Sequence, residues 1–295
     1  MALRKRGNMQ FAFENGDTII TGERIDPAIV FDCGQCFRFF PDGDDEFSGV
    51  AHGRLLRVLD KKDAIVLKDV DEAEFNSRWR DFFDLDTDYS AITSAFEEDE
   101  IVSAAVRSCP GMRLLNQEPF ETLITFIISA NNNIPRIRKI VEAICRLCGD
   151  RINCEGERYA FPSPEQLAAL SEEDLKKCGA GYRAAYIAET SKVIADRKVD
   201  LNAVEKLEYT AAKKELCRLK GVGPKVADCI LLFSMHKKNA FPMDVWIKRT
   251  LNVLFGFTPK NDKEAMEFAR DRFGEWGGII QQYLFWYARE VKMGN

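Results

Sequence analysis

The sequence lacks any long hydrophobic run. No stretch reaches the ~18 consecutive apolar residues that indicate a membrane span. The first six residues carry positive charge but no apolar segment follows them, which argues against an export signal. We therefore expect an intracellular protein with no membrane partner, cytoplasmic in a bacterium or archaeon and nuclear in a eukaryote.

The sequence also lacks an overall positive charge. Its 42 Lys and Arg against 47 Asp and Glu give a formal net charge of −5, which taken alone weakens a nucleic-acid hypothesis. The charge is unevenly distributed, because residues 211–250 hold nine Lys or Arg against three acids, a balance of +6 that leaves −11 for the rest. A basic patch on an acidic body suits an enzyme that contacts DNA phosphates with one face.

Evidence for a disulfide framework is absent, although the chain has nine cysteines. An odd number in a long chain without an export signal favours reduced thiols. Two CxxC pairs would be a fair zinc signal in isolation. However, Cys145 and Cys148 fall within an amphipathic helical pattern, where cysteine is commonly a small core residue.

Chain length and periodicity indicate an α+β protein. With 295 residues and 46% hydrophobic content, the chain can bury a core large enough for two domains or three tightly packed subdomains. Between residues 10 and 67, short alternating runs are separated by turn signals such as Asn15-Gly16, which predicts an antiparallel sheet of hairpins. After Asp71 the pattern becomes helical and stays so.

The most informative stretch follows Leu219. Gly221 and Gly223 predict a tight turn with uncovered backbone N–H groups, which leads straight into a helix whose positive end favours an anion. Such a hairpin binds phosphates without reading bases. Lys225 lies in the first turn of that helix, where the dipole and burial disfavour the ammonium form, so we expect a lowered pKa and a nucleophilic amine. The alternative is an ordinary helix start beside an exposed lysine.

Two further residues complete the candidate site. Cys229 follows Lys225 by four positions, so both lie on one helical face. This pair can exist as ammonium and thiolate, a dipole that recognises an oppositely polarised base, although Cys229 is equally suited to packing. Asp244 follows Pro242 at the start of the next helix. A carboxylate there caps the helix, polarises a nucleophile or stabilises the positive sugar formed when a glycosidic bond breaks.

This constellation resembles the helix-hairpin-helix GPD superfamily of DNA repair glycosylases, and in particular its 8-oxoguanine DNA glycosylase/AP lyases. In that family a lysine after the hairpin marks enzymes that also nick the strand, so the resemblance implies that Lys225 and Asp244 are catalytic and that Cys229 forms a wall of the base pocket. The implied phosphate-binding hairpin comprises Lys220, Gly221, Val222 and Gly223.

The resemblance also bears on cofactors. It implies that none is required, and it leaves room for a monovalent or divalent cation at the hairpin. Relatives that carry an iron-sulfur cluster hold it with cysteines beyond the catalytic aspartate. Since this chain has no cysteine after Cys229, we expect no cluster and no bound metal.

Two helical stretches extend the resemblance to the opposite DNA strand. The asparagine triplet from Asn131 to Asn133, with Arg136 after it, is similar to the segment of 8-oxoguanine glycosylases that reads the cytosine left behind by an extruded base. Tyr182 and Arg183 match an aromatic wedge and a cytosine-binding arginine. The resemblance thus implies that Tyr182 fills the vacated stack, whereas Asn131, Arg136 and Arg183 contact the cytosine. The alternative for the asparagines is a loop held together by local hydrogen bonds.

The resemblance continues into the pocket for the damaged base. Gly34 matches a glycine whose carbonyl accepts a hydrogen bond from the N7 proton that oxidised guanine has and normal guanine lacks. Gln281 and Phe285 match the residue at the Watson–Crick edge and the stacking aromatic, with Gln282 as the alternative one position on. Trp246 departs from the pattern, because some relatives carry there a histidine that helps to hold phosphate.

The likeness runs from about residue 34 to 285 and defines the expected organisation. An N-terminal antiparallel β-sheet domain, residues 1–95, precedes two mostly helical subdomains. Residues 96–125 plus 256–295 pack on the sheet, and residues 126–255 contain the helix-hairpin-helix and the catalytic residues.

The expected function is that of a monomeric, bifunctional glycosylase. It flips 8-oxoguanine paired with cytosine out of duplex DNA, excises it through a lysine Schiff base and nicks the strand by β-elimination. One alternative is a related glycosylase for alkylated or other oxidised bases. The alternative from another class is a non-enzymatic helix-hairpin-helix module that only docks on DNA.

Overall fold

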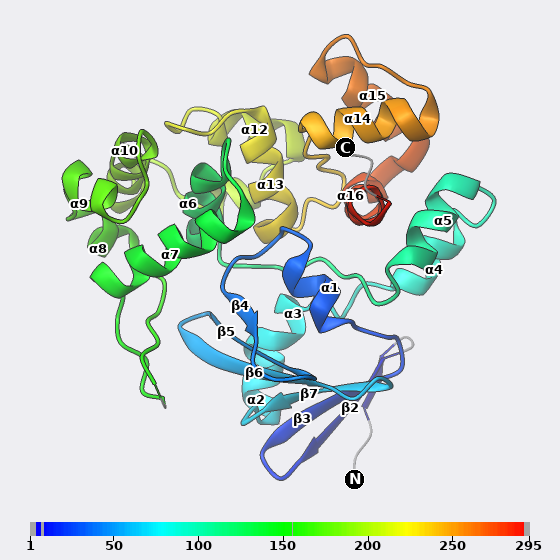
Figure 1. Ribbon diagram of the computed structural model, residues 1–295, viewed down its shortest axis with the longest axis horizontal. Helices are drawn as coiled ribbons and strands as arrows, with labels where there is room; N and C mark the ends of the chain where they lie inside the picture. Colours follow the sequence, from blue (N-terminus) through cyan, green and yellow to red (C-terminus); the bar gives the residue numbers. More distant parts are fainter. Residues whose placement is uncertain (1–3, 7–8, 155, 292–295) are drawn as a thin grey trace.

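Hairpins build the N-terminal part of the protein, as the alternating sequence pattern predicts (Figure 1). The computed structural model describes residues 4–6, 9–154 and 156–291. All neighbouring strands are antiparallel, in the order β1-β2-β3-β7-β6-β5-β4. The strands are β1 (Arg4–Arg6), β2 (Met9–Glu14), β3 (Asp17–Thr21), β4 (Phe39–Pro41), β5 (Glu46–Ala51), β6 (Arg54–Asp60) and β7 (Ala64–Lys68).

Short helices cover the sheet and enclose a first apolar core. Strands β3 and β7 alternate between buried and partly buried residues, so one face of each carries the apolar side chains. Against this face pack aromatic residues such as Trp79 and Phe82, both almost fully buried. The helical elements concerned are α1 (Pro27–Asp32), α2 (Glu72–Glu74), the π-helix η1 (Phe75–Trp79) and α3 (Arg80–Phe82).

Helices form the rest of the described chain, and the only strand-like pairing among its residues after 71 is a single bridge between Arg151 and Tyr159. They are α4 (Tyr89–Ser94), α5 (Glu100–Ser108), α6 (Pro119–Ser129), α7 (Ile134–Cys148), α8 (Pro164–Ala168), α9 (Glu172–Lys177), α10 (Arg183–Ala195), α11 (Leu201–Glu205), α12 (Tyr209–Leu216), α13 (Pro224–Ser234), α14 (Val245–Phe255), α15 (Asp262–Phe273), the 3-10 helix η2 (Gly274–Trp276) and α16 (Gly277–Glu290). The predicted α+β class is confirmed.

The second core is built around α6 and α13. Both are buried over most of their length, as expected of helices that are apolar on every side, and they pack on each other (Figure 1). Helix α16 packs against α5, α14 and α15. The contact between α16 and α5 agrees with grouping residues 96–125 with 256–295, although the three-part division stays a prediction. None of the helices in the described ranges has the length and apolar character that a membrane crossing needs.

A buried arginine joins the sheet to the helices. Arg38, which precedes β4, donates a hydrogen bond from Nε to Glu142 of α7 at 2.9 Å and one from Nη2 to the carbonyl oxygen of Tyr159 at 2.5 Å. Glu121 of α6 places Oε2 4.0 Å from Nη1 of the same guanidinium. Burial, opposed only in part by the charge of Arg38, raises the pKa of Glu121 to about 7. This joint therefore contains a carboxyl group that changes charge near neutral pH.

The unfolding free energy should fall as the pH rises from about 4.5 to about 7. In this range Glu121 loses its proton in the unfolded chain but keeps it in the folded protein, so a rising pH favours unfolding. The variant Glu121→Gln removes this titration. When the pH is raised from about 4.5 to about 8, the unfolding free energy of the variant should therefore fall by about 1 to 3 kcal/mol less than that of the wild type. Urea unfolding at several pH values measures both free energies.

Glu142→Gln is the matched control for this experiment. Glu142 also contacts Arg38, but its side chain is 41% exposed. This variant should keep most of the pH dependence of the wild type, because burial is the main cause of the raised pKa of Glu121 and the charge of Glu142 is the smallest of its causes. Identical pH dependence in the wild type and Glu121→Gln would show that Glu121 does not carry the titration.

Candidate active site

The hairpin between α12 and α13 packs closely on α10. Gly221 has a φ of +82°, and a Cβ at this position would lie 2.8 Å from Cβ of Tyr186, so only glycine fits. The carbonyl oxygen of Lys220 accepts a hydrogen bond from Oγ1 of Thr190 at 2.8 Å. Gly223 is the N-cap of α13 and has no side chain to cover the N–H groups of the first turn. These groups remain open to an anion such as a phosphate.

A buried ion pair holds the two helices of this motif together. Lys213 of α12 places Nζ 2.7 Å from Oδ2 of Asp228 in α13, and the hydroxyl of Tyr209 donates to Oδ1 at 2.8 Å. Burial raises the pKa of Asp228 to about 6, although the charge of Lys213 opposes the shift. At neutral pH the carboxylate of Asp228 is thus charged, and it accepts hydrogen bonds from both Tyr209 and Lys213 of α12. These contacts fix α13 against α12.

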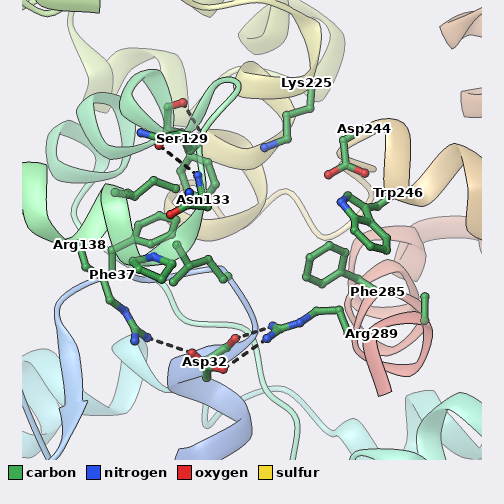
Figure 2. Close-up of a pocket in the computed structure, with 17 residues that line it drawn as sticks. Asp32, Phe37, Ser129, Asn133, Arg138, Lys225, Asp244, Trp246, Phe285 and Arg289 are labelled. Carbon is green, nitrogen blue, oxygen red and sulfur yellow. Dashed lines mark hydrogen bonds and ion pairs between the residues drawn. The ribbon is translucent and has the colours of Figure 1, made fainter. Parts of the chain in front are cut away.

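A cleft of about 700 Å³ opens between the sheet subdomain, α7, α13 and α16 (Figure 2). Four of the sequence-predicted residues line it, although they come from four distant parts of the chain: Gly34, Lys225, Asp244 and Phe285. The side chains of Lys225 and Asp244 extend into the cleft from the same side. The predicted nucleophile and the predicted carboxylate therefore share one cavity with two predicted base contacts.

Lys225 is held as an ammonium ion, contrary to the expectation of a lowered pKa. Its side chain is largely buried, with Nζ 5.3 Å from the centre of the Phe126 ring. Burial acts to lower the pKa of Lys225, but attraction to Cys229 and Asp244 outweighs it and raises the pKa above the ordinary value. The helix-dipole and burial argument was incomplete because it omitted these two partners. The amine must give up a proton before it can attack.

Cys229 lies beneath Lys225 and not among the residues that line the cleft. The two side chains are hydrogen bonded to each other. Burial raises the pKa of the Cys229 thiol to about 11, and the Lys225 ammonium offsets only part of this shift. In the unbound protein the pair is therefore an ammonium and a thiol at neutral pH, and the expected ammonium–thiolate dipole is not present.

Asp244 caps its helix and also lies in the lining of the cleft. Its Oδ1 accepts a hydrogen bond from the N–H of Ile247 at 2.8 Å, so it caps α14, and the residue also lines the cleft. Trp246 lines the cleft beside it and is 45% exposed. An apolar indole thus occupies the position at which some relatives place a histidine.

The predicted base contacts differ in their accessibility. Gly34 has a φ of +80°, and a Cβ there would lie 3.8 Å from Cε1 of Phe285, so these two residues are neighbours in the lining of the cleft. Gln281 is buried in α16 and does not line the cleft. Its Oε1 has no hydrogen-bond partner among the described residues. Gln282, the alternative, donates to Sγ of Cys33 at 3.9 Å instead.

The residues predicted to contact the opposite strand gather around Ala130. Arg183 is only 3% exposed, and its guanidinium donates hydrogen bonds to the carbonyl oxygens of Ala130 and Asn131. Tyr182 is 56% exposed beside it, and Arg136 is exposed at the start of α7. In the unbound protein Arg183 therefore supports the asparagine loop from another helix. The side chains of Asn132 and Asn133 also make local hydrogen bonds, as the alternative for this loop predicts. Contacts of these residues with a cytosine stay a prediction.

Three charged residues of the cleft were missed by the sequence reasoning. Asp32, Arg138 and Arg289 line it, and the two arginines hydrogen-bond to Asp32 (Figure 2). One signal was available, since Arg289 follows Phe285 by four residues and so shares its helix face. The two other positions give no local signal.

The cysteines form neither bridges nor an evident metal site. All nine lie within the described residues and are free thiols, as the sequence predicts. Within the same part of the chain, no group of three or more His, Cys, Asp or Glu side chains is arranged to hold a metal ion.

Comparison with known families divides the chain into two adjoining parts. Residues 18–123 match the family described as 8-oxoguanine DNA glycosylase, N-terminal domain. Residues 124–275 match the family described as HhH-GPD superfamily base excision DNA repair protein.

Individual proteins are similar over most of the chain. A probable N-glycosylase/DNA lyase of Methanothermobacter thermautotrophicus is 38% identical over 75% of this chain and 77% of its own length. An N-glycosylase/DNA lyase of Arabidopsis thaliana is 34% identical over 90% of this chain and 78% of its own. A crystal structure of Clostridium acetobutylicum 8-oxoguanine glycosylase/lyase, in complex with DNA containing cytosine opposite 8-oxoG, is 36% identical. It covers 96% of this chain and 98% of its own with a TM-score of 0.92.

Proposed function

We infer the function from one premise: the chain belongs to the HhH-GPD superfamily of base excision DNA repair proteins, with an N-terminal domain of the 8-oxoguanine DNA glycosylase family. It is a DNA N-glycosylase with an associated lyase activity, and it excises 8-oxoguanine from duplex DNA. The observation that carries the assignment is the shared cleft of Lys225, Asp244, Gly34 and Phe285.

We propose that DNA docks on the hairpin of residues 220–223. The open N–H groups at the start of α13 bind a strand phosphate, and the surrounding Lys and Arg of residues 211–250 add attraction that salt weakens. A monovalent or divalent cation at this hairpin stays a prediction, as do the monomeric state and the cellular compartment. The chemistry itself needs no cofactor, since an amine and a carboxylate supply it.

Because the pKa of Lys225 is raised, its side chain carries a proton that it can donate in the reaction. As the glycosidic bond breaks, its electron pair goes to the base, which takes the proton from the Lys225 ammonium. The amine thus freed bonds to C1′, while the carboxylate of Asp244 stabilises positive charge on the sugar. Loss of a proton and opening of the sugar ring give a Schiff base. Loss of a proton from C2′ to solvent, with formation of a C2′–C3′ double bond and departure of the 3′ phosphate, then cuts the strand.

We propose that base recognition divides between two surfaces. In the cleft, the Gly34 carbonyl accepts the N7 proton of the oxidised base and Phe285 stacks on its ring. Gln281 is buried behind the lining, and its Oε1 accepts from the Watson–Crick edge of the base after its side chain has turned into the cleft. Outside the cleft, the exposed Tyr182 fills the vacated stack. The loop at Asn131, together with Arg136 and Arg183, contacts the unpaired cytosine after Arg183 has exchanged its present carbonyl partners.

Borohydride should trap a covalent adduct between the wild-type protein and 8-oxoguanine duplex DNA. Lys225→Gln should abolish this adduct because the nucleophilic amine is gone, while binding to the damaged duplex persists. Gel analysis after reduction measures both. Lys214→Gln, an exposed lysine in the same basic segment, is the control and should keep trapping. An adduct with Lys225→Gln would move the nucleophile elsewhere, and a wild type that forms no product would favour the docking module.

Asp244→Asn should slow base excision about 100-fold because it removes the negative charge opposite the sugar. Asparagine caps a helix as well as aspartate does, so the melting temperature should change by less than about 2 °C. Single-turnover kinetics and thermal unfolding measure the two effects. Asp200→Asn, the same change at the N-cap of α11, should leave excision unchanged. Undiminished excision by Asp244→Asn would remove this carboxylate from the reaction.

A panel of duplexes tests the substrate assignment. 8-Oxoguanine opposite cytosine should be excised at least about 100-fold faster than guanine, because only the oxidised base offers the N7 proton to the Gly34 carbonyl. Excision should be about 10-fold slower opposite adenine, guanine or thymine, since the cytosine contacts are lost. Equal activity on alkylated purines would favour the related glycosylase instead.

A further inference from the structure

Three charged side chains form the floor of the cleft and take no part in the chemistry above (Figure 2). Asp32 ends α1, Arg138 comes from α7 and Arg289 from α16. The Asp32 carboxylate accepts one hydrogen bond from Nη2 of Arg138 at 3.1 Å and one from Nη2 of Arg289 at 3.4 Å. The two guanidinium groups reach it from opposite sides. We call these three residues the Asp32 bridge.

Each arginine also holds the backbone that leads into Gly34. Nη1 of Arg289 donates to the carbonyl oxygen of Asp32 at 2.7 Å, and Nη2 of Arg138 donates to that of Phe31 at 3.2 Å. These carbonyls end α1 and have no partner within the helix. The helix dipole also favours positive charge at this end. The position of the segment before Gly34 therefore depends on both arginines.

The other side of this segment rests on a rigid support. Gln35 is fully buried, and its Nε2 donates to the carbonyl oxygens of Val30 at 2.9 Å and of Arg113 at 2.8 Å. Its Oε1 accepts from the N–H of Leu115 at 2.8 Å. The backbone on both sides of Gly34 is thus held in place, by the two arginines before it and by the buried Gln35 side chain after it.

Arg289 connects this segment to the opposite wall of the cleft. Its guanidinium carbon lies 6.0 Å from the centre of the Phe285 ring and 5.4 Å from that of Trp286. A Cβ on Gly34 would lie 3.8 Å from Cε1 of Phe285, so Gly34 and this ring are neighbours in the lining of the cleft, and Arg289 reaches both the segment before Gly34 and the ring. The Asp32 bridge thus links the position of Gly34 to that of Phe285.

We propose that Asp32 is a positioning residue that, through Arg138 and Arg289, aligns the Gly34 carbonyl with the Phe285 ring and so sets how strictly the pocket prefers oxidised to normal guanine. This inference rests on the proposed function. The Asp32 side chain is 48% exposed, so its ion pairs add little to the stability of the free protein. When a base fills the cleft and displaces water, the lower local dielectric strengthens them.

The substitution Asp32→Asn isolates this role because it removes the charge and keeps the shape. The two guanidinium groups then face each other without a neutralising carboxylate, and they repel. This repulsion should shift the Gly34 segment and Phe285 relative to each other. A misplacement of this kind slows a reaction that depends on alignment.

The experiment compares two kinds of DNA. Single-turnover excision is measured on duplexes with 8-oxoguanine or guanine opposite cytosine, and borohydride trapping is measured on a duplex with a preformed abasic site, which brings no base into the pocket. Asp32→Asn should slow excision of 8-oxoguanine about 10-fold and lower the ratio of the 8-oxoguanine rate to the guanine rate. Trapping on the abasic duplex should change less than about 2-fold.

Asp69→Asn is the matched control. It makes the same change in the exposed Asp69–Arg57 ion pair of the sheet, outside the residues that line the cleft, and it should leave all three measurements at the wild-type value. A second measurement uses Arg289→Gln alone and combined with Asp32→Asn. If Asp32 acts through Arg289, the double variant loses about as much as the more impaired single variant.

Two results would overturn the inference. A wild-type rate ratio in Asp32→Asn would show that the bridge does not tune the pocket, and an equal loss on the abasic duplex would show that Asp32 only supports the fold. If the fold-losses in excision rate of the two single variants multiplied in the double variant, Asp32 would not act through Arg289. Failure of the proposed function would look different, because the wild type itself would release no base and form no adduct.

Discussion

A charged amine in a largely buried position is the constraint on which the site depends. Burial acts to lower the pKa of Lys225, but its interactions with Cys229 and Asp244 raise the pKa above the ordinary value, so the amine carries its charge at neutral pH. Helix α13 cannot shift to expose the amine, since it is buried along most of its length and tied to α12 by the Lys213–Asp228 ion pair. The fold thus fixes the amine, and the other groups of the cleft are arranged around it.

The cleft is assembled from segments that lie far apart in sequence, and charged contacts connect them. Arg38 ties the sheet subdomain to α6 and α7, and Asp32 ties the end of α1 to α7 and α16. Apolar packing holds such segments together but is not directional, whereas hydrogen bonds to charged groups fix orientation. A pocket that must orient the Gly34 carbonyl against the Phe285 ring needs the second kind of contact.

Local patterns made part of this structure predictable. The alternation of apolar and polar residues predicted the sheet, and the short spacing from Gly221 to Lys225 predicted the hairpin and the lysine after it. Both features depend on residues only a few positions apart. The Asp32 bridge was not predictable, since its members are more than 100 residues apart. The hydrogen bond from Arg183 to the carbonyl oxygen of Ala130 was not predictable either, because only folding brings these two residues together. The sequence therefore predicted only a cytosine contact for Arg183.

The sign of the Lys225 pKa shift was the most instructive failure, because it changes how the reaction must run. A neutral amine can attack without losing a proton, but it supplies no proton to the departing base. Bound DNA excludes water from the cleft, so water is a poor alternative donor. An ammonium brings that proton to the place where it is needed and becomes a nucleophile in giving it up. In the proposed reaction Asp244 has two successive roles, since its carboxylate first stabilises the ammonium and then the positive sugar. The carboxylate that, after Cys229, helps to raise the pKa of Lys225 would thus balance the charge of the site as positive charge passes from the amine to the sugar in the proposed reaction.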